Sequence, residues 1–286
     1  MMGDRFRRRG ERLQALSINR LLPNIVTLLA LCAGLTAIRF GLQARYPEAV
    51  IAIIIAAIFD ALDGRLARRL GATSRFGAEL DSLSDFISFG VAPALMLYMW
   101  TMNNAGSLGW ALVLLFPVCC ALRLARFNTA LGAEPAEPWR AGFFTGVPAP
   151  MGAGLVLLPM MLSFELGDGI FRHPIVVGAV MAGVAALMVS RIPTYSFKRG
   201  RVPRQWIMPT LVLVSALAAV LVTSPWTAFP LLALIYIATF PFSIRAAYLA
   251  RRAAANDDRA AKPAAAAPAA VAQASPPPPA SRQLDA

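Results

Sequence analysis

Apolar stretches recur along the chain between residues 21 and 248. A transmembrane helix needs about 20 predominantly apolar residues to cross roughly 30 Å of hydrocarbon. The second stretch is shorter than this, and its helix is expected to continue through Asp60 and Asp63 toward Arg69. The stretches lie near 21–43, 49–64, 81–101, 107–124, 149–166, 174–190, 206–223 and 227–248. The pattern predicts an all-α integral membrane protein with about eight transmembrane helices.

Composition supports the membrane assignment. Hydrophobic residues make up 58% of the chain and charged residues only 15%, whereas a soluble domain carries about 25% charged residues. The three cysteines, Cys32, Cys119 and Cys120, lie within apolar stretches and do not form a disulfide or zinc pattern. We therefore expect them to be core residues.

Charge fixes the expected orientation. All but three of the 27 Lys and Arg residues lie before the first span, in the even-numbered loops, or at the end of the last span and beyond it. Cytoplasmic loops collect basic residues, so both termini and the active site are expected on the cytoplasmic side of the cell (inner) membrane. The same bias accounts for the net charge of +12 without a nucleic acid partner.

Three segments follow from this pattern. Residues 1–20 are basic and are predicted to form a cytoplasmic, interfacial segment without a removable signal peptide. Residues 21–250 form the predicted transmembrane domain. Residues 251–286 are rich in Ala and Pro and are expected to be a disordered cytoplasmic tail.

Four aspartates interrupt this apolar sequence within the stretch DALDGRLARRLGATSRFGAELDSLSD. Asp60 and Asp63 are three residues apart, and Asp81 and Asp85 are four apart, so each pair projects from one face of its helix. Each charge costs roughly 2.5–3.5 kcal/mol inside a membrane. Carboxylates are hard ligands that suit Mg²⁺ or Mn²⁺. The pattern predicts a divalent metal site, with a proton or cation relay as the alternative.

Glycine and arginine accompany the aspartates. Gly64 follows Asp63 directly, and Gly77 lies four residues before Asp81. A glycine on the metal face lets a bulky ligand approach the backbone, and Arg68 is placed to hold a phosphate beside the ion. Glycines are also common where helices simply pack. Together with the aspartates, these residues point to a diphosphate site.

This spacing resembles the signature of the CDP-alcohol phosphotransferases. The resemblance implies six core transmembrane helices, here with two more, usually in a homodimer whose cytoplasm-facing cavity opens to the lipid. It implies that Asp60, Asp63 and Asp81 bind Mg²⁺ or Mn²⁺, and that Asp85 is a further ligand and the general base. The residues implied to line the CDP-lipid site are Gly64, Ala67, Arg68 and Gly77.

Further motifs resemble the bacterial integral-membrane subfamily that transfers to L-serine. They are Asn24 and Thr27 in LLPNIVTLL, SLSDFISFGVAPA (82–94), RLARFN (123–128), GVPAP (146–150) and SFK (196–198). The resemblance implies CDP-diacylglycerol and L-serine as substrates. Candidate acceptor-binding residues are Ser88, Arg123, Arg126 and Asn128, each of which also has a plain structural interpretation as a basic flank, a cap or a helix contact.

Three alternatives stay open at this point. The same chemistry with glycerol 3-phosphate or an inositol phosphate as acceptor would need more cationic residues near Asp85. A cation or proton transporter would place the aspartates at the bilayer midplane between repeats. A lipid-binding scaffold without activity would be favoured by a missing aspartate, and all four are present.

Overall fold

The computed structural model describes residues 18–131, 143–190, 192–195, 206–249 and 252. The predicted interfacial segment lies almost wholly outside the described residues, and so do the SFK motif and nearly all of the predicted tail. Every predicted apolar stretch falls on a helix of the described chain. The helices are α2 (Ile18–Leu42), α3 (Tyr46–Arg69), α4 (Arg75–Asp85), the π-helix η1 (Phe86–Val91), α5 (Ala92–Trp100), the 3-10 helix η2 (Met102–Ala105), α6 (Gly106–Leu131), α7 (Ala149–Val156), α8 (Leu158–Leu166), α9 (Pro174–Val189), α10 (Ile207–Thr223) and α11 (Pro225–Ala238).

Five helical stretches in the described chain are long and apolar enough to cross a membrane. They are Leu21–Leu42, Arg75–Trp100, Met102–Thr129, Ala149–Leu166 and Pro225–Leu249. α9 and α10 are apolar but shorter, with 16 and 17 residues. α3 has 24 residues but carries several charges toward its C-terminal end. The described helices therefore fit a multi-pass membrane protein, while the number of eight spans stays a prediction.

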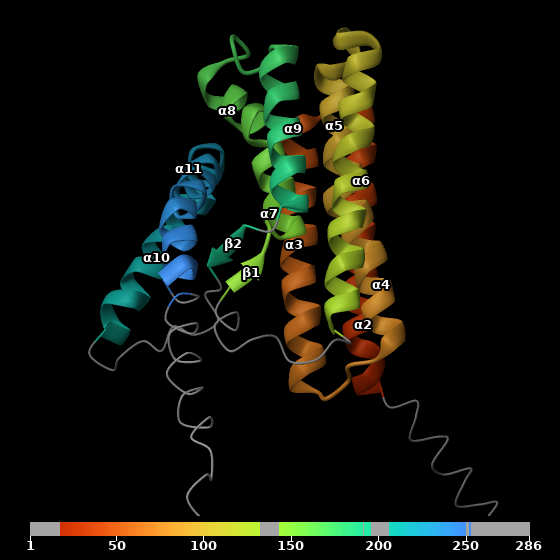
Figure 1. The fold of residues 1–286 in the computed structure, drawn as a ribbon, viewed down its shortest axis with the longest axis vertical. Helices are drawn as coiled ribbons and strands as arrows, with labels where there is room; N and C mark the ends of the chain where they lie inside the picture. The colour runs from red at the N-terminus through yellow and green to blue at the C-terminus, as the bar shows by residue number, and fades with distance from the viewer. Residues whose placement is uncertain (1–17, 132–142, 191, 196–205, 250–251, 253–286) are drawn as a thin grey trace, which may run out of the picture.

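The helices form a bundle in which α2 and α3 pack along their lengths (Figure 1). α2 also contacts α4, η1 and α5, and α6 packs against α9. Small residues allow close packing: a Cβ on Gly34 of α2 would lie 2.3 Å from Oγ of Ser88 in η1. Helix interfaces in membranes favour such residues because lipid provides no hydrophobic drive for association.

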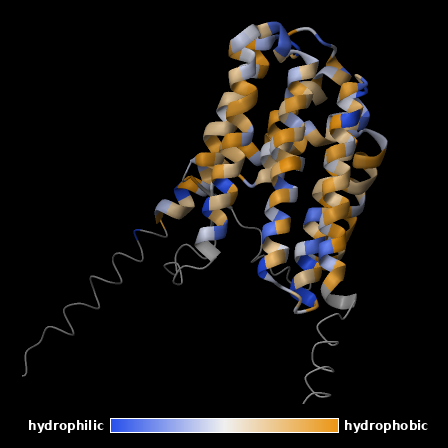
Figure 2. Ribbon diagram, turned by 90° about the vertical axis from the view of Figure 1, so that its right-hand side faces the viewer, coloured by the Kyte–Doolittle hydropathy of each residue, from blue (hydrophilic) through white to orange (hydrophobic). Residues whose placement is uncertain are grey.

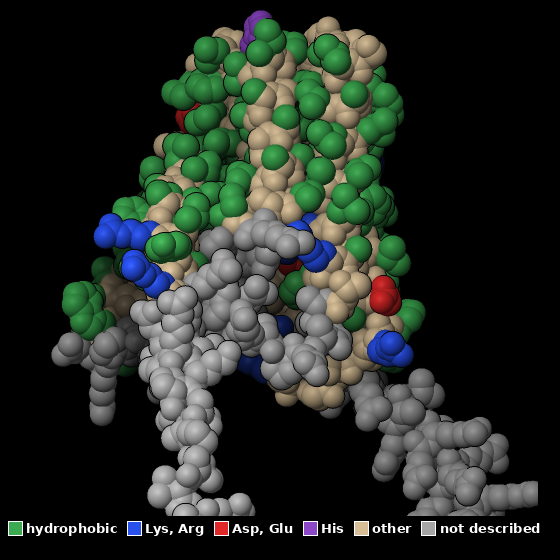
Figure 3. Space-filling view, in the orientation of Figure 1, with side chains coloured by type: hydrophobic (Ala, Val, Ile, Leu, Met, Phe, Trp, Pro, Cys, Tyr) green, Lys and Arg blue, Asp and Glu red, His purple; other side chains and the backbone are tan. Residues whose placement is uncertain are grey.

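Polar residues gather at both ends of the bundle, and apolar residues cover its middle (Figure 2). Arg65, Arg68, Arg69 and Arg75 lie around the α3–α4 turn, which we call the basic end. Arg45 and Arg172 lie at the opposite end, where Arg172 donates to the carbonyl of Trp100 and pairs with Asp168 at 2.6 Å. Figure 3 likewise shows Lys and Arg over the lower half and His at the top.

Two short strands of the described chain depart from the all-α expectation. β1 (Phe143–Thr145) pairs antiparallel with β2 (Pro193–Tyr195). The pairing continues one residue beyond the strands, because the Gly146 amide donates a hydrogen bond to the Ile192 carbonyl at 2.9 Å. Three-residue strands are too short to show an alternating pattern in sequence. The pair joins the chain before α7 to the chain after α9.

Candidate functional site

Three of the four aspartates converge at the basic end. Asp60 and Asp63 of α3 and Asp81 of α4 each place one carboxylate oxygen within 4.8 Å of the others. Asp63 is buried, and the other two are half-buried. Three carboxylate oxygens at this separation fit a hard divalent cation. The donor set therefore fits Mg²⁺ or Mn²⁺.

The α3–α4 turn brings the two pairs together. Ser74 is the N-cap of α4, and its hydroxyl accepts a hydrogen bond from the Gly77 amide at 3.0 Å. Such caps satisfy amides that have no partner within the helix. α4 therefore starts at a defined point and projects Asp81 and Asp85 from one face, toward α3.

The fourth aspartate lies at the side of the cluster. Asp85 is within hydrogen-bonding reach of Asp60, and Arg123 of α6 attracts both carboxylates. The π-helical η1 begins directly after Asp85. Single π-turns occur frequently at functional sites because they reposition side chains within a continuous helix. An acid and a cation therefore face the cluster from α4 and α6.

α2 supplies two polar residues that the sequence interpretation placed in a motif but not in the site. The Thr27 hydroxyl lies 2.6 Å from Oδ2 of Asp63 and 3.0 Å from the Pro23 carbonyl. The Thr27 carbonyl accepts from the Ser84 hydroxyl at 3.2 Å. Asn24 faces Gly77. The signal that could have identified them was their polarity within LLPNIVTLL.

The two signature glycines differ in their surroundings. A Cβ on Gly77 would lie 3.0 Å from Oδ1 of Asn24 and 3.1 Å from Oγ of Ser74. A Cβ on Gly64 would meet only the Arg68 guanidinium, at 3.5 Å. Gly77 thus allows close packing of α4 against α2, while Gly64 leaves open space beneath Arg68. Ala67, also on α3, is half-buried.

Two acceptor candidates make contacts within the protein. Arg126 donates to the carbonyls at the C-terminus of α9, to Val189 at 2.9 Å and to Met188 at 3.3 Å. A cation suits that end of a helix. Asn128 donates to the Ser82 hydroxyl at 2.9 Å, which ties α6 to α4. These contacts favour structural roles for both residues.

The other two candidates differ from each other. Ser88 is fully buried and donates to the Ala30 carbonyl at 3.3 Å, at the crossing of η1 and α2. Arg123 is half-buried and lies close enough to Asp60 and Asp85 for electrostatic attraction. The structure therefore brings Arg123 to the aspartate cluster and leaves Ser88 in a helix contact.

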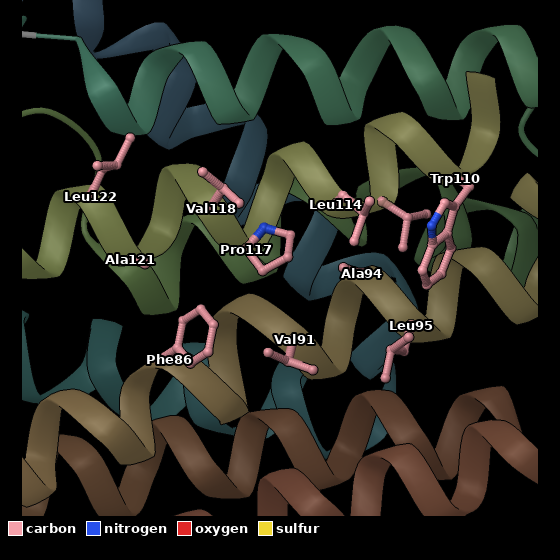
Figure 4. Close-up of a pocket in the computed structure, with 11 residues that line it drawn as sticks. Phe86, Val91, Ala94, Leu95, Trp110, Leu114, Pro117, Val118, Ala121 and Leu122 are labelled. Atoms are coloured by element: carbon pink, nitrogen blue, oxygen red, sulfur yellow. The ribbon is translucent and has the colours of Figure 1, made fainter. Parts of the chain in front are cut away.

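A second feature lies away from the cluster. A groove of about 420 Å³ lies between α6 and the neighbouring η1 and α5 helices, and it is lined by mainly apolar side chains, including Phe86, Trp110 and Pro117 (Figure 4). Such a surface is suited to lipid. The side chains of the described residues that line it are uncharged, and the indole N–H of Trp110 is their one polar group.

Comparison with known proteins identifies the class. Residues 20–190 match the family model of the CDP-alcohol phosphatidyltransferases, and residues 205–241 match the model named CDP-alcohol phosphatidyltransferase 2. The chain therefore belongs to the CDP-alcohol phosphatidyltransferase family. The resemblance inferred from the aspartate signature is confirmed.

Curated relatives share most of the chain. A Mycobacterium leprae protein is 42% identical over 228 residues, which cover 79% of this chain and 75% of the relative. A Mycobacterium tuberculosis protein is 39% identical over 247 residues, covering 86% and 84%. A Helicobacter pylori protein is 35% identical over 196 residues, covering 68% and 78%. All three are named CDP-diacylglycerol–serine O-phosphatidyltransferase.

Proposed function

We propose that this protein transfers the phosphatidyl group of CDP-diacylglycerol to the hydroxyl of L-serine, forming phosphatidylserine and releasing CMP. The observation that carries the proposal is the convergence of the Asp60, Asp63 and Asp81 carboxylates within 4.8 Å, beside Asp85 and Arg123, in a chain of this family. The named activity of the relatives supports serine as acceptor. Membership of a transferase family argues against the transporter and scaffold alternatives.

Asp60, Asp63 and Asp81 would hold Mg²⁺ or Mn²⁺, with Asp85 as a further ligand. Such an ion neutralises charge on a diphosphate and stabilises the departing phosphate. Arg68 lies over the open space at Gly64 and binds a phosphate oxygen of the donor. Gly64, Ala67 and Gly77 leave room for the CDP group.

Asp85 is the proposed general base. The serine hydroxyl oxygen attacks the phosphorus that carries diacylglycerol, and the bond from that phosphorus to the bridging oxygen breaks as CMP leaves. Asp85 accepts the hydroxyl proton. A carboxylate is a weak base for an alcohol, so the reaction depends on direct hydrogen-bond contact between Asp85 and the hydroxyl.

Arg123 is the proposed partner of the serine carboxylate. It lies within electrostatic range of Asp85, whereas Arg126 donates hydrogen bonds to the C-terminus of α9. A single guanidinium can bind a carboxylate through two hydrogen bonds. An acceptor that carries a phosphate brings more negative charge and would call for more cations than these contacts leave available on α6. This favours serine over glycerol 3-phosphate or an inositol phosphate.

The proposal extends to location and assembly. The asymmetry of basic residues supports an inner-membrane protein with its site facing the cytoplasm. The 21–250 segment would form the catalytic membrane domain, flanked by the basic 1–20 segment and the 251–286 tail. The family resemblance supports a homodimer.

The test is CMP release by purified protein in detergent with CDP-diacylglycerol and Mg²⁺ or Mn²⁺. L-serine, glycerol 3-phosphate and inositol phosphate are supplied separately, and the lipid product is identified. Release that depends on serine, with matching phosphatidylserine, supports the proposal. Release with another acceptor would keep the metal and base assignments but replace serine, and failure with all three would overturn the proposed activity.

A further inference from the structure

A second cavity lies on α3, around the helix from the aspartate face. Its volume is about 450 Å³, within the range of roughly 300–1,000 Å³ typical of ligand pockets. α3, α7, α8 and α11 form its walls, and we call it the α3–α11 slot. All of its lining residues are apolar or glycine except Arg65. The slot therefore combines a long apolar interior with one cation.

The slot runs along the helix axis toward the basic end. Its α3 wall extends from Val50 to Arg65, which is about 22 Å at 1.5 Å per residue. One leaflet contributes about half of the roughly 30 Å hydrocarbon core. The slot is therefore long enough for an extended lipid chain that spans one leaflet.

The geometry of α3 connects the slot to the proposed donor site. Ala57 and Ala61 line the slot, and Gly64 and Arg68 continue the same stripe of α3, since residues three and four apart stack on one helix face. Gly64 leaves open space beneath Arg68. An apolar chain in the slot would therefore end beside the space proposed for the diphosphate, with Arg65 at the mouth.

α11 provides the wall opposite α3 through Phe229, Leu232 and Ala233. It is fixed to α8 at the end away from Arg65: Trp226 packs edge-on against Phe164 with 4.8 Å between ring centroids, and Thr227 donates to Glu165 at 3.3 Å. The helix is thus held in place without filling the slot.

Gly154 of α7 also lines the slot, and a Cβ built on it meets nothing within 4 Å. A side chain at this position would enter free space and would not displace a neighbour. The slot is therefore a cavity that a single substitution can fill without a clash at the first added atom.

We propose that the α3–α11 slot binds one acyl chain of the CDP-lipid donor, and that α11 sets the chain length the enzyme accepts. The proposal rests on the proposed transferase function and adds the location of the lipid chain. Arg65 at the mouth of the slot and the continuity with Gly64 and Arg68 favour the CDP-lipid donor as the occupant. A bulk phospholipid has no diphosphate that would bind at Gly64 and Arg68 and so place its acyl chain in the slot.

The test compares CDP-dipalmitoylglycerol with CDP-dioctanoylglycerol in the full-length protein. Gly154→Leu should lower the ratio of long-chain to short-chain kcat/KM about tenfold, because a few methylene groups in an apolar pocket decide specificity at this scale. Phe229→Ala should shift the ratio in the opposite direction. Binding is measured separately, as the rise in Tm on adding each donor, so the test does not depend on turnover.

Gly183→Leu is the matched control, because Gly183 is an exposed glycine on α9 and a Cβ built on it also meets nothing within 4 Å. It should leave both ratios unchanged. An unchanged ratio in Gly154→Leu, by rate and by Tm, would overturn the slot assignment, as would an equal shift in Gly183→Leu. If the long-chain donor raises the Tm of the wild-type protein but no CMP is released, the proposed function is contradicted. The slot assignment is then decided by whether Gly154→Leu reduces the Tm rise with the long-chain donor.

Discussion

The Thr27 hydroxyl lies 2.6 Å from Oδ2 of Asp63, and this contact joins α2 to the carboxylate cluster of α3 and α4. Asp63 is only 4% exposed, so this hydroxyl orients a carboxylate that solvent barely reaches. Groups that hold a metal ligand in place tune the site even though they do not touch the ion. Thr27 is therefore a positioning residue for Asp63.

Thr27→Val should weaken metal binding while keeping the shape of the side chain. The hydroxyl is lost and Asp63 can rotate, so we expect the Mg²⁺ or Mn²⁺ concentration for half-maximal CMP release to rise about 10- to 100-fold. The measurement is a metal titration of CMP release. Thr27→Ser keeps the hydroxyl and should stay close to the wild-type metal dependence, and equal losses in both variants would count against the positioning role.

Asp85→Asn should abolish transfer while metal-dependent binding of the CDP-lipid is largely retained. The amide cannot accept the hydroxyl proton, but the three carboxylates of Asp60, Asp63 and Asp81 are untouched. Donor binding is followed by the rise in Tm with CDP-diacylglycerol and metal. If binding and turnover disappear together, the role of Asp85 is ligation and not proton transfer.

The two signature glycines should respond differently to substitution. Gly64→Leu should block donor binding without unfolding the protein, because its Cβ has room and the rest of the side chain occupies the proposed CDP space. Gly77→Leu should lower Tm even without substrate, because its Cβ would lie 3.0 Å from Asn24 and 3.1 Å from Ser74. The comparison uses Tm without and with donor, and retained activity in Gly64→Leu would refute the nucleotide-space argument.

The sequence predicted the positions of the helices and the convergence of three of the four aspartates, because both follow from local rules. Long apolar runs identify helices, and spacings of three and four place Asp60 with Asp63 and Asp81 with Asp85 on shared faces. These rules need no knowledge of how distant segments meet. The prediction of Mg²⁺ or Mn²⁺ rests on the same local reasoning, because it depends only on ligand chemistry, and it stays a prediction.

Contacts between distant segments could not be predicted in this way. Arg123 and Arg126 look alike in RLARFN, yet Arg123 interacts electrostatically with Asp85 and Arg126 donates hydrogen bonds to the end of α9. Their separation follows from the α6–α9 packing, which has no periodic signal in the sequence. The contact of Thr27 with Asp63 was not predicted for the same reason, since the two residues are 36 positions apart.

Substitutions of the two arginines of α6 should therefore have different effects on kinetics and stability. Arg123→Gln should raise the KM for L-serine and have less effect on donor binding, because it removes the proposed partner of the serine carboxylate. Arg126→Gln should lower the free energy of unfolding by about 1 kcal/mol with little change in KM, because it removes hydrogen bonds to the α9 carbonyls. Steady-state kinetics with varied serine, together with thermal unfolding, distinguish the two. The reverse result, in which Arg126→Gln raises the serine KM at unchanged Tm, would place the acceptor between α6 and α9 and away from Asp85.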